Sequence, residues 1–172
     1  MIEVGIGLGS NLDDRCGNII AALKALNSIP SIMVTRVSSI YATPPWGVED
    51  QPEFLNAAAL IRTSLSPSML LDTCKAIERS LGRALGRRWG PREIDIDLLF
   101  FGDLQISSDD LVLPHLNLFE RLFVLIPLNE IMDGRRVARR DLKDAILQLS
   151  GIDPPSEIRL DREATERLKD AI

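Results

Sequence analysis

The chain has 172 residues, an apolar fraction of 45% and a formal net charge of −5. This length suits one domain with a substantial hydrophobic core, and the acidic balance argues against a general polyanion binder. We expect neither a membrane span nor a signal peptide, because no long apolar run is present and the N-terminus lacks a basic region. Cys16 and Cys74 lack metal-ligand spacing, so we expect two buried free thiols in a cytoplasmic protein.

The first four predicted elements are a strand, a helix and two further strands. Residues 2–8 alternate between apolar and other side chains, which is typical of a half-buried strand. Residues 14–26 repeat apolar side chains at helical spacing, and Pro30 excludes a longer helix. Residues 32–41 are rich in β-branched side chains and residues 54–63 present two alternating faces, so both ranges are predicted to be strands.

A second helix and a fourth strand follow. Ser66 and Pro67 are typical of a helix start, and apolar side chains recur at helical spacing after them. Residues 94–101 are mostly apolar and strand-favouring. Short strand-like runs then occur at residues 111–113 and 123–126.

The predicted order to residue 101 is βαββαβ. This order favours an α+β fold, a ferredoxin-like sandwich with an antiparallel sheet and both helices on one face. A doubly wound parallel sheet would need a helix between the second and third strands, where the chain is too short and too rich in proline. We expect a core domain over residues 1–134 and a helical C-terminal extension of unknown role over residues 135–172.

Two aspartates interrupt the apolar strand at residues 94–101. Asp95 and Asp97 are two positions apart, so their side chains share one face about 7 Å apart, while Ile94 and Ile96 point to the opposite face. A buried unpaired carboxylate is costly, so the acids are predicted to lie on the sheet face that the two helices leave open. They would share that face with Asn56.

Two carboxylates this close repel each other unless a cation lies between them. Mg²⁺ is the natural candidate, because proteins hold it with one or two carboxylates together with substrate phosphates. The alternative is a solvated strand face on which the two acids are incidental.

A basic loop precedes this strand. The sequence "GRALGRRWGPR" contains Trp89 and three glycines together with Arg83, Arg87, Arg88 and Arg92. Arginine binds phosphate bidentately, so acids that hold a metal beside this loop indicate a nucleoside triphosphate site. The alternative is a solvated surface loop. No P-loop is present, and the lone His115 is read as a structural or hydrogen-bonding residue rather than a general base.

Several separated motifs together resemble the 6-hydroxymethyl-7,8-dihydropterin pyrophosphokinases of folate biosynthesis. They are "GLGSNL", "TPPWG", "QPEFLNAA", "RRWGPREIDIDLLFFG" and "LPHLNLFERLFVLIPL". The resemblance covers residues 1 to about 131 and implies the ferredoxin-like fold that the element order also predicts. It further implies an enzyme that transfers the terminal pyrophosphoryl group of ATP to the pterin's hydroxymethyl oxygen and releases AMP. We expect the chain to be a monomer.

The resemblance also implies roles for individual residues. Asp95 and Asp97 would hold two Mg²⁺ ions that bridge the ATP phosphates. Phosphate or nucleotide contacts, some of them catalytic, are implied for Glu78, Arg83, Arg88, Arg92, His115 and Arg121, with Trp89 closing a lid. The pterin would lie between Phe54 and Phe123, with its edge bound by Asn56 and by backbone groups around Thr43, Pro44, Pro45 and Trp46.

Two other classes of function remain open at this point. A metal-dependent nucleotidyl transferase or cyclase can also carry acids on a ferredoxin-like sheet. An RNA-binding module of similar topology would need a basic sheet face with exposed aromatic side chains, and Asp95 and Asp97 would repel phosphate there without a metal. We therefore expect small-molecule substrates and no nucleic-acid or membrane partner.

Overall fold

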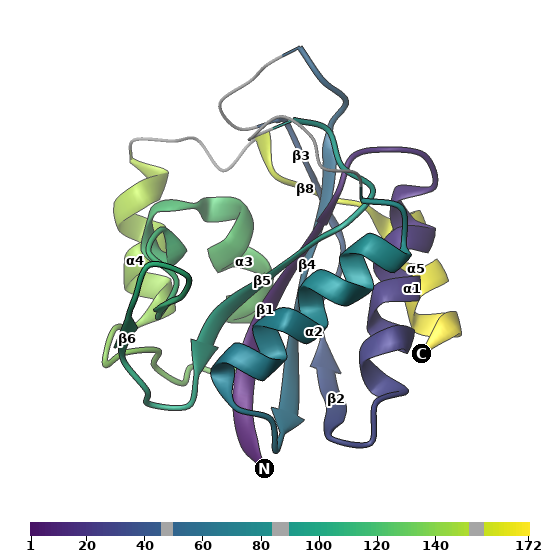
Figure 1. Cartoon of the computed structure of the whole chain (residues 1–172). Helices are drawn as coiled ribbons and strands as arrows, with labels where there is room; N and C mark the ends of the chain where they lie inside the picture. Colours follow the sequence, from purple (N-terminus) through teal and green to yellow (C-terminus); the bar gives the residue numbers. More distant parts are fainter. Residues whose placement is uncertain (46–49, 84–89, 152–156) are drawn as a thin grey trace.

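The fold is built on one antiparallel sheet. The structure is a computed structural model and describes residues 1–45, 50–83, 90–151 and 157–172. Within these residues the sheet has the strand order β5-β1-β4-β3-β8, with β2 also pairing with β4 (Figure 1). Its strands are β1 (Ile2–Ser10), β2 (Ile32–Val37), β3 (Tyr41–Thr43), β4 (Phe54–Thr63), β5 (Asp95–Phe101) and β8 (Arg159–Leu160).

Two helices cover one face of the sheet, as the sequence predicts. α1 (Arg15–Asn27) begins where the Asp14 side chain accepts the backbone N–H of Gly17. α2 (Pro67–Ser80) is capped by Ser66, which accepts the backbone N–H of Met69. The βαββαβ order is thereby confirmed. The predicted strand at 32–41 is instead split into β2 and β3, which both pair with β4.

The alternation of β4 divides the sheet between two cores. Leu55, Ala57, Ala59 and Ile61 belong to the core beneath α1 and α2, and Ile94, Ile96 and Leu98 of β5 join them. Ala58 and Leu60 face the other way and belong to a second core. The predicted assignment of side chains to the two faces of these strands is therefore confirmed.

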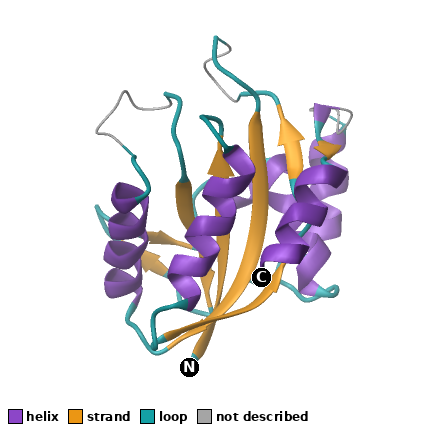
Figure 2. Ribbon diagram, turned by 90° about the vertical axis from the view of Figure 1, so that its right-hand side faces the viewer, coloured by secondary structure: helices purple, strands orange, loops and turns teal. Residues whose placement is uncertain are grey.

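The second face is not left open along its whole length, which corrects one expectation. α3 (Leu122–Met132) and α4 (Leu142–Ser150) pack there, and helices lie on both sides of the strands (Figure 2). The predicted strand at 123–126 is wrong, because those residues belong to α3. The apolar run is too short to distinguish the two periodicities, whereas Leu122, Leu125, Leu128 and Ile131 are buried at helical spacing.

The remaining elements lie outside the main sheet. β6 (Ile106–Ser107) pairs with β7 (Val112–Leu113), near the predicted strand-like run, and η1 (Leu118–Glu120) precedes α3. α5 (Arg162–Ala171) packs on α1, while α4 packs on α3. The division into residues 1–134 and 135–172 stays a prediction. No helix in the described ranges is long and apolar enough to cross a membrane.

The second core makes α3 essential to stability. Leu128 is completely buried within that core, so we expect Leu128→Ala to lower the free energy of unfolding by about 2–5 kcal/mol. Leu147→Ala in α4 is the matched control, because Leu147 is 72% exposed and its truncation should change stability by less than about 0.5 kcal/mol. Urea unfolding monitored by circular dichroism measures both. Equal losses in the two variants would contradict this account of the second core.

Candidate active site

The uncovered end of the second sheet face forms a cavity of about 360 Å³. This volume falls in the range of about 300–1,000 Å³ that is typical of small-molecule sites. Most of the residues singled out from the sequence line it together: Thr43, Pro44, Phe54, Asn56, Arg83, Arg92, Asp95, Asp97, His115, Arg121 and Phe123. Pro45 and Glu78 are not among the lining residues, and Trp46, Arg87, Arg88 and Trp89 lie outside the described residues.

Glycines of the central strand form part of the cavity floor. Gly9 of β1 pairs with Asn56 of β4 on one side and with Asp95 of β5 on the other, and Gly7 pairs with Asp97. A Cβ atom at Gly9 would come within 3.0 Å of the Asn56 side-chain oxygen. Because β1 contributes no side chain at these positions, the polar groups of β4 and β5 face each other across about 10 Å of open floor.

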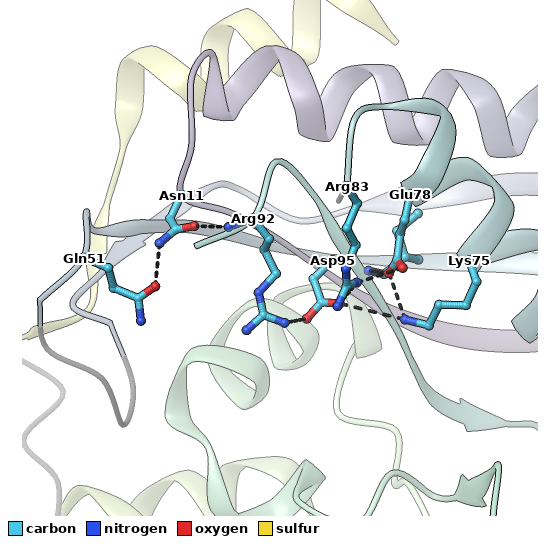
Figure 3. A network of polar contacts seen from close by, with 8 residues as sticks. Asn11, Gln51, Lys75, Glu78, Arg83, Arg92 and Asp95 are labelled. Carbon is cyan, nitrogen blue, oxygen red and sulfur yellow. Dashed lines mark hydrogen bonds and ion pairs between the residues drawn. The ribbon is translucent and has the colours of Figure 1, made fainter. Parts of the chain in front are cut away.

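Asp95 is the centre of an ion-pair cluster (Figure 3). One carboxylate oxygen accepts a hydrogen bond from Arg83, and the other accepts one from Arg92 at 2.5 Å. The Lys75 ammonium lies 3.9 Å away. Burial raises the pKa of Asp95, but the positive charges of Arg92, Arg83 and Lys75 outweigh that effect and hold the pKa below its usual range.

Asp97 has the opposite environment. Burial and then the negative charge of Asp95 raise the pKa of Asp97 to about 6. Among the described residues, no hydrogen bond or ion pair to the Asp97 carboxylate is found. The site therefore contains one compensated carboxylate and one that lacks a counter-charge in contact with it, and both line the cavity.

Glu78 supports this cluster from behind β5. It is only 1% exposed, and its carboxylate accepts the backbone N–H of Ile96 at 2.7 Å. The same carboxylate pairs with Lys75 at 2.9 Å and with Arg83 at 2.7 Å. Glu78 thus ties α2 to β5 and orients two of the cations that face Asp95.

The sequence reading missed Lys75, which lines the cavity. Its position three residues before Glu78 on a predicted helix places both side chains on one helix face, and this spacing was the available signal.

A second group that the sequence reading missed links three loops beside the cavity. Asn11 is 1% exposed, and its side chain donates to the side-chain oxygen of Gln51 and to the carbonyl of Pro52. Its own oxygen accepts the backbone N–H of Arg92 at 2.8 Å (Figure 3). No local pattern indicated these contacts, because Asn11 and Arg92 are 81 positions apart in the chain.

Two phenylalanine rings flank the cavity. Phe54 and Phe123 are partly exposed and belong to neither hydrophobic core. The Arg92 guanidinium lies 5.8 Å from the centre of the Phe54 ring, and that of Arg121 lies 5.8 Å from the centre of the Phe123 ring. Each ring thus presents an aromatic surface to the cavity beside a cation.

Polar groups with defined hydrogen-bonding directions lie near the two rings. The Asn56 side chain donates to the Thr43 hydroxyl at 2.7 Å, which fixes the amide orientation. The Nδ1 atom of His115 accepts the backbone N–H of Asn117, so Nε2 carries the proton in the neutral ring. Burial and then the charge of Arg121 lower the pKa of His115, which favours this neutral donor.

Asp95 and Asp97 can supply only some of the ligands that a metal ion needs. No cluster of three or more His, Cys, Asp or Glu ligands occurs within the described ranges. Two neighbouring carboxylates beside several cations instead suit a hard ion that takes its other ligands from a bound phosphate and water. The cavity therefore combines a cationic edge, a pair of acids and two aromatic surfaces, an arrangement that suits a phosphoryl-transfer enzyme with a flat second substrate.

Comparisons with known proteins agree with this class. Residues 5–133 match the sequence model of the family 7,8-dihydro-6-hydroxymethylpterin-pyrophosphokinase (HPPK). The chain is 45% identical over 155 residues to the 2-amino-4-hydroxy-6-hydroxymethyldihydropteridine pyrophosphokinase of Methylorubrum extorquens, covering 89% of this chain and 98% of that protein. It is 48% identical over 126 residues to the Bacillus subtilis enzyme of the same name, covering 73% and 75% of the two chains. The chain belongs to the HPPK family.

Solved structures show the same fold. The Plasmodium falciparum HPPK-DHPS with pterin and p-hydroxybenzoate superposes with a TM-score of 0.70 at 14% identity, over 92% of this chain and 46% of that one. An HPPK-DHPS in complex with substrates gives a TM-score of 0.71 over 88% of this chain. This chain spans less than half of each of these proteins, and at such identity the likeness concerns the fold alone.

The raised pKa of Asp97 makes stability depend on pH. A folded-state pKa of about 6, above the unfolded value of about 4, means that the folded chain binds the proton more tightly. The free energy of unfolding should therefore fall as the pH rises through this window, by at most about 3 kcal/mol. We expect Asp97→Asn to remove most of this fall, as measured by urea unfolding at pH 4.5 and pH 8 in EDTA.

The control for that measurement is Asp103→Asn, because Asp103 is an exposed acid just beyond β5. It should follow the wild-type pH dependence. If Asp97→Asn also followed the wild-type curve, the environment assigned to Asp97 would be wrong.

Proposed function

We propose that the chain transfers the pyrophosphoryl group of ATP to the hydroxymethyl oxygen of 6-hydroxymethyl-7,8-dihydropterin, in folate biosynthesis. The products are AMP and the pterin diphosphate. The observation that carries this proposal is that residues of separate HPPK motifs line one cavity: Asp95 and Asp97, the arginines, and the two phenylalanines.

The pterin is proposed to lie between Phe54 and Phe123. A flat, polar bicyclic ring suits two aromatic surfaces with a few convergent hydrogen bonds at its edge. The Asn56 amide is held by Thr43 and can offer such bonds. Backbone groups around Pro44, Pro45 and Trp46 are proposed to add others. This arrangement would leave the hydroxymethyl arm free to point toward Asp95 and Asp97.

The ATP phosphates are proposed to bind at the cationic edge of the cavity. Arg83, Arg92 and Arg121 line it with His115, which offers a neutral donor. The Arg92 Nε–H is buried and has no hydrogen-bond partner in the described part of the chain, so a phosphate oxygen could satisfy it. Arg88 and Trp89 are proposed to add a phosphate contact and a lid, and Glu78 to orient Arg83.

Asp95 and Asp97 are the proposed ligands of two Mg²⁺ ions. The uncompensated Asp97 carboxylate fits this role, because a cation would relieve the repulsion from Asp95. Bound Mg²⁺ would neutralise charge on the phosphates and stabilise the attacking and leaving oxygens. For Asp95 to take part, Arg83 and Arg92 would exchange its carboxylate for phosphate oxygens, which they bind with the same planar geometry.

The chain's contribution to the reaction is then alignment and charge compensation. Phosphoryl transfer needs little covalent assistance, so a dedicated general base is not required. Phe54, Phe123 and Asn56 would orient the nucleophilic oxygen, while the arginines and His115 would hold the phosphates in line with it.

The other two functions have less support. The acids line the cavity on the uncovered part of the sheet, where an RNA-binding module needs positive charge. A nucleotidyl transferase or cyclase does not account for the proposed pterin site between the Phe54 and Phe123 rings, here called the aromatic slot. The monomeric state and the cytoplasmic location stay predictions, and a chromatographic mass measurement with light scattering would test the former.

The acids should be indispensable for turnover. We expect Asp97→Ala and Asp95→Ala each to lower the rate of AMP formation by at least about 10³-fold, because metal binding and charge compensation are lost. Asp97→Ala should keep or raise the melting temperature of the free protein, since it removes the repulsion from Asp95 and breaks no hydrogen bond or ion pair of the described residues. Asp103→Ala is the control and should retain full activity. Turnover within a few-fold of wild type in Asp97→Ala would overturn the assignment of the acids.

The aromatic slot should serve the pterin and not ATP. An offset-stacked contact contributes about 0.5–1.5 kcal/mol beyond its buried area. Phe54→Ala and Phe123→Ala should therefore weaken pterin binding by about 5- to 150-fold and leave the affinity for an ATP analogue nearly unchanged. Isothermal titration calorimetry with each ligand separately measures both.

Phe101→Leu is the control for the aromatic slot, because Phe101 is buried in the core beneath α1 and α2 and does not line the cavity. It should reduce stability without a selective effect on pterin binding. Equal losses for both ligands in the Phe54 and Phe123 variants would contradict the slot.

A further inference from the structure

The C-terminal segment Arg159–Ala171, here called the C-terminal strap, lies beyond the residues matched by the family model. It consists of β8 and α5. In Figure 1 β8 lies beside β3 and α5 lies beside α1. β8 pairs antiparallel with β3, with Leu160 opposite Tyr41 and Arg159 opposite Ala42. The strap thus covers the edge of the strand that ends at Thr43.

The strap also holds the backbone just before β3. The carbonyl of Ile40 accepts the backbone N–H of Asp161 at 2.9 Å, and the N–H of Ile40 donates to the Thr165 hydroxyl at 2.9 Å. Thr165 in turn donates to the carbonyl of Asp161 at 2.6 Å, within the first turn of α5. Ile40 is completely buried and Thr165 is 6% exposed, so both polar groups of the Ile40 backbone depend on the strap.

A second connection reaches the beginning of β4. Arg159 donates to both carboxylate oxygens of Glu53, at 2.7 and 3.0 Å. The carbonyl of Glu53 accepts a hydrogen bond from Arg15 at 2.8 Å. Glu53 directly precedes Phe54, whose ring flanks the cavity. The strap therefore contacts the chain on both sides of the wall formed by Thr43, Pro44 and Phe54: the Ile40 backbone on one side and the Glu53 carboxylate on the other.

β3 is too short to hold this wall alone. It contains three residues and pairs with Phe54, Leu55 and Asn56 of β4. A three-residue strand with a free edge forms few hydrogen bonds and frays easily. Pairing on both edges, together with the two bonds to Ile40, holds the Thr43 hydroxyl where it accepts the Asn56 amide.

The strap makes no comparable contact with the cationic side of the cavity. Its hydrogen bonds and ion pairs found among the described residues end on β3 and its preceding residue, on Glu53, and on Asp14 and Cys16 near the start of α1. None of them reaches α2, β5 or His115. A change in the strap should therefore act on one wall of the cavity and not on the other.

We propose that the C-terminal strap is a positioning element for the pterin wall, with Thr165 and Arg159 as its positioning residues. Thr165 holds β3 through the Ile40 N–H, and Arg159 holds the entry to β4 through Glu53. The inference rests on the proposed function in one respect: the ligand of this wall is the pterin. It assigns a role to residues that lie outside the segment matched by the family model. By pairing with the second edge of β3, these residues order the strand that carries Thr43.

The Thr165 hydroxyl provides the sharper test. Thr165→Val removes the acceptor for the Ile40 N–H and keeps the side-chain volume, whereas Thr165→Ser keeps the hydroxyl. We expect Thr165→Val to raise the pterin dissociation constant about two- to tenfold, with the value for an ATP analogue within twofold of wild type. Thr165→Ser should restore pterin affinity. Calorimetry in separate titrations, and KM for each substrate, measure this.

Arg159 provides an independent test at an exposed position. Arg159→Ala should raise the pterin KM about two- to fivefold while the ATP KM stays within twofold. Arg162→Ala is the matched control, because Arg162 is exposed on the same segment and makes no hydrogen bond or ion pair with the described residues. Arg159 is exposed, so its variant should fold like the wild type.

The outcomes separate the inference from the function on which it rests. Wild-type protein that forms no AMP from ATP and the pterin would refute the proposed function. Active wild type with unchanged pterin affinity in both Thr165→Val and Arg159→Ala would refute the strap alone. Equal weakening of pterin and ATP analogue in either variant would also refute it, because a general loss of structure predicts that result.

Discussion

The site depends on the unequal compensation of two carboxylates placed on one face of β5. Asp95 and Asp97 lie close together in a partly buried site, and only Asp95 has counter-charges in contact with it within the described residues. Of the three cations that converge on Asp95, Lys75 and Arg83 are oriented by the buried Glu78. Arg92 reaches Asp95 from three residues earlier in the chain. This asymmetry lowers the pKa of one acid and raises that of the other, so the two neighbouring side chains differ in their affinity for a cation.

The position of this cluster follows from how the second face is covered. α3 and α4 bury Ala58, Leu60 and Leu99, but their coverage ends before Asn56, Asp95 and Asp97. The same helix that closes the second core also delivers Phe123 to the rim of the cavity. Stability and site geometry are therefore linked through α3, since its packing on β4 sets the separation between Phe123 and Phe54.

Much of this arrangement can be predicted from local patterns, and the remainder needs tertiary contacts. Strand parity predicts that Asn56, Asp95 and Asp97 share a face, and Ser66 with Pro67 predicts the start of α2. The alternation of side chains between the two faces of β5 breaks after Leu98, where a register shift turns both Leu99 and Phe100 toward α3. The apolar run at residues 123–126 is too short to show whether its period is that of a helix or of a strand. Asn11 and Arg92 are far apart in the sequence, and only the folded chain brings them into contact.

The two sides of the cavity are held by different forces. The cationic side depends on charges that a phosphate can replace, because the bond from Arg92 to Asp95 can be exchanged for an equivalent bond to an anion. The side proposed to bind the pterin depends on backbone pairing and on buried bonds such as that from the Ile40 N–H to the Thr165 hydroxyl, which no ligand substitutes. A site with one exchangeable wall and one fixed wall can admit a highly charged nucleotide while keeping a rigid slot for a flat ring. Preorganisation of that slot would limit the entropy lost when the pterin binds there.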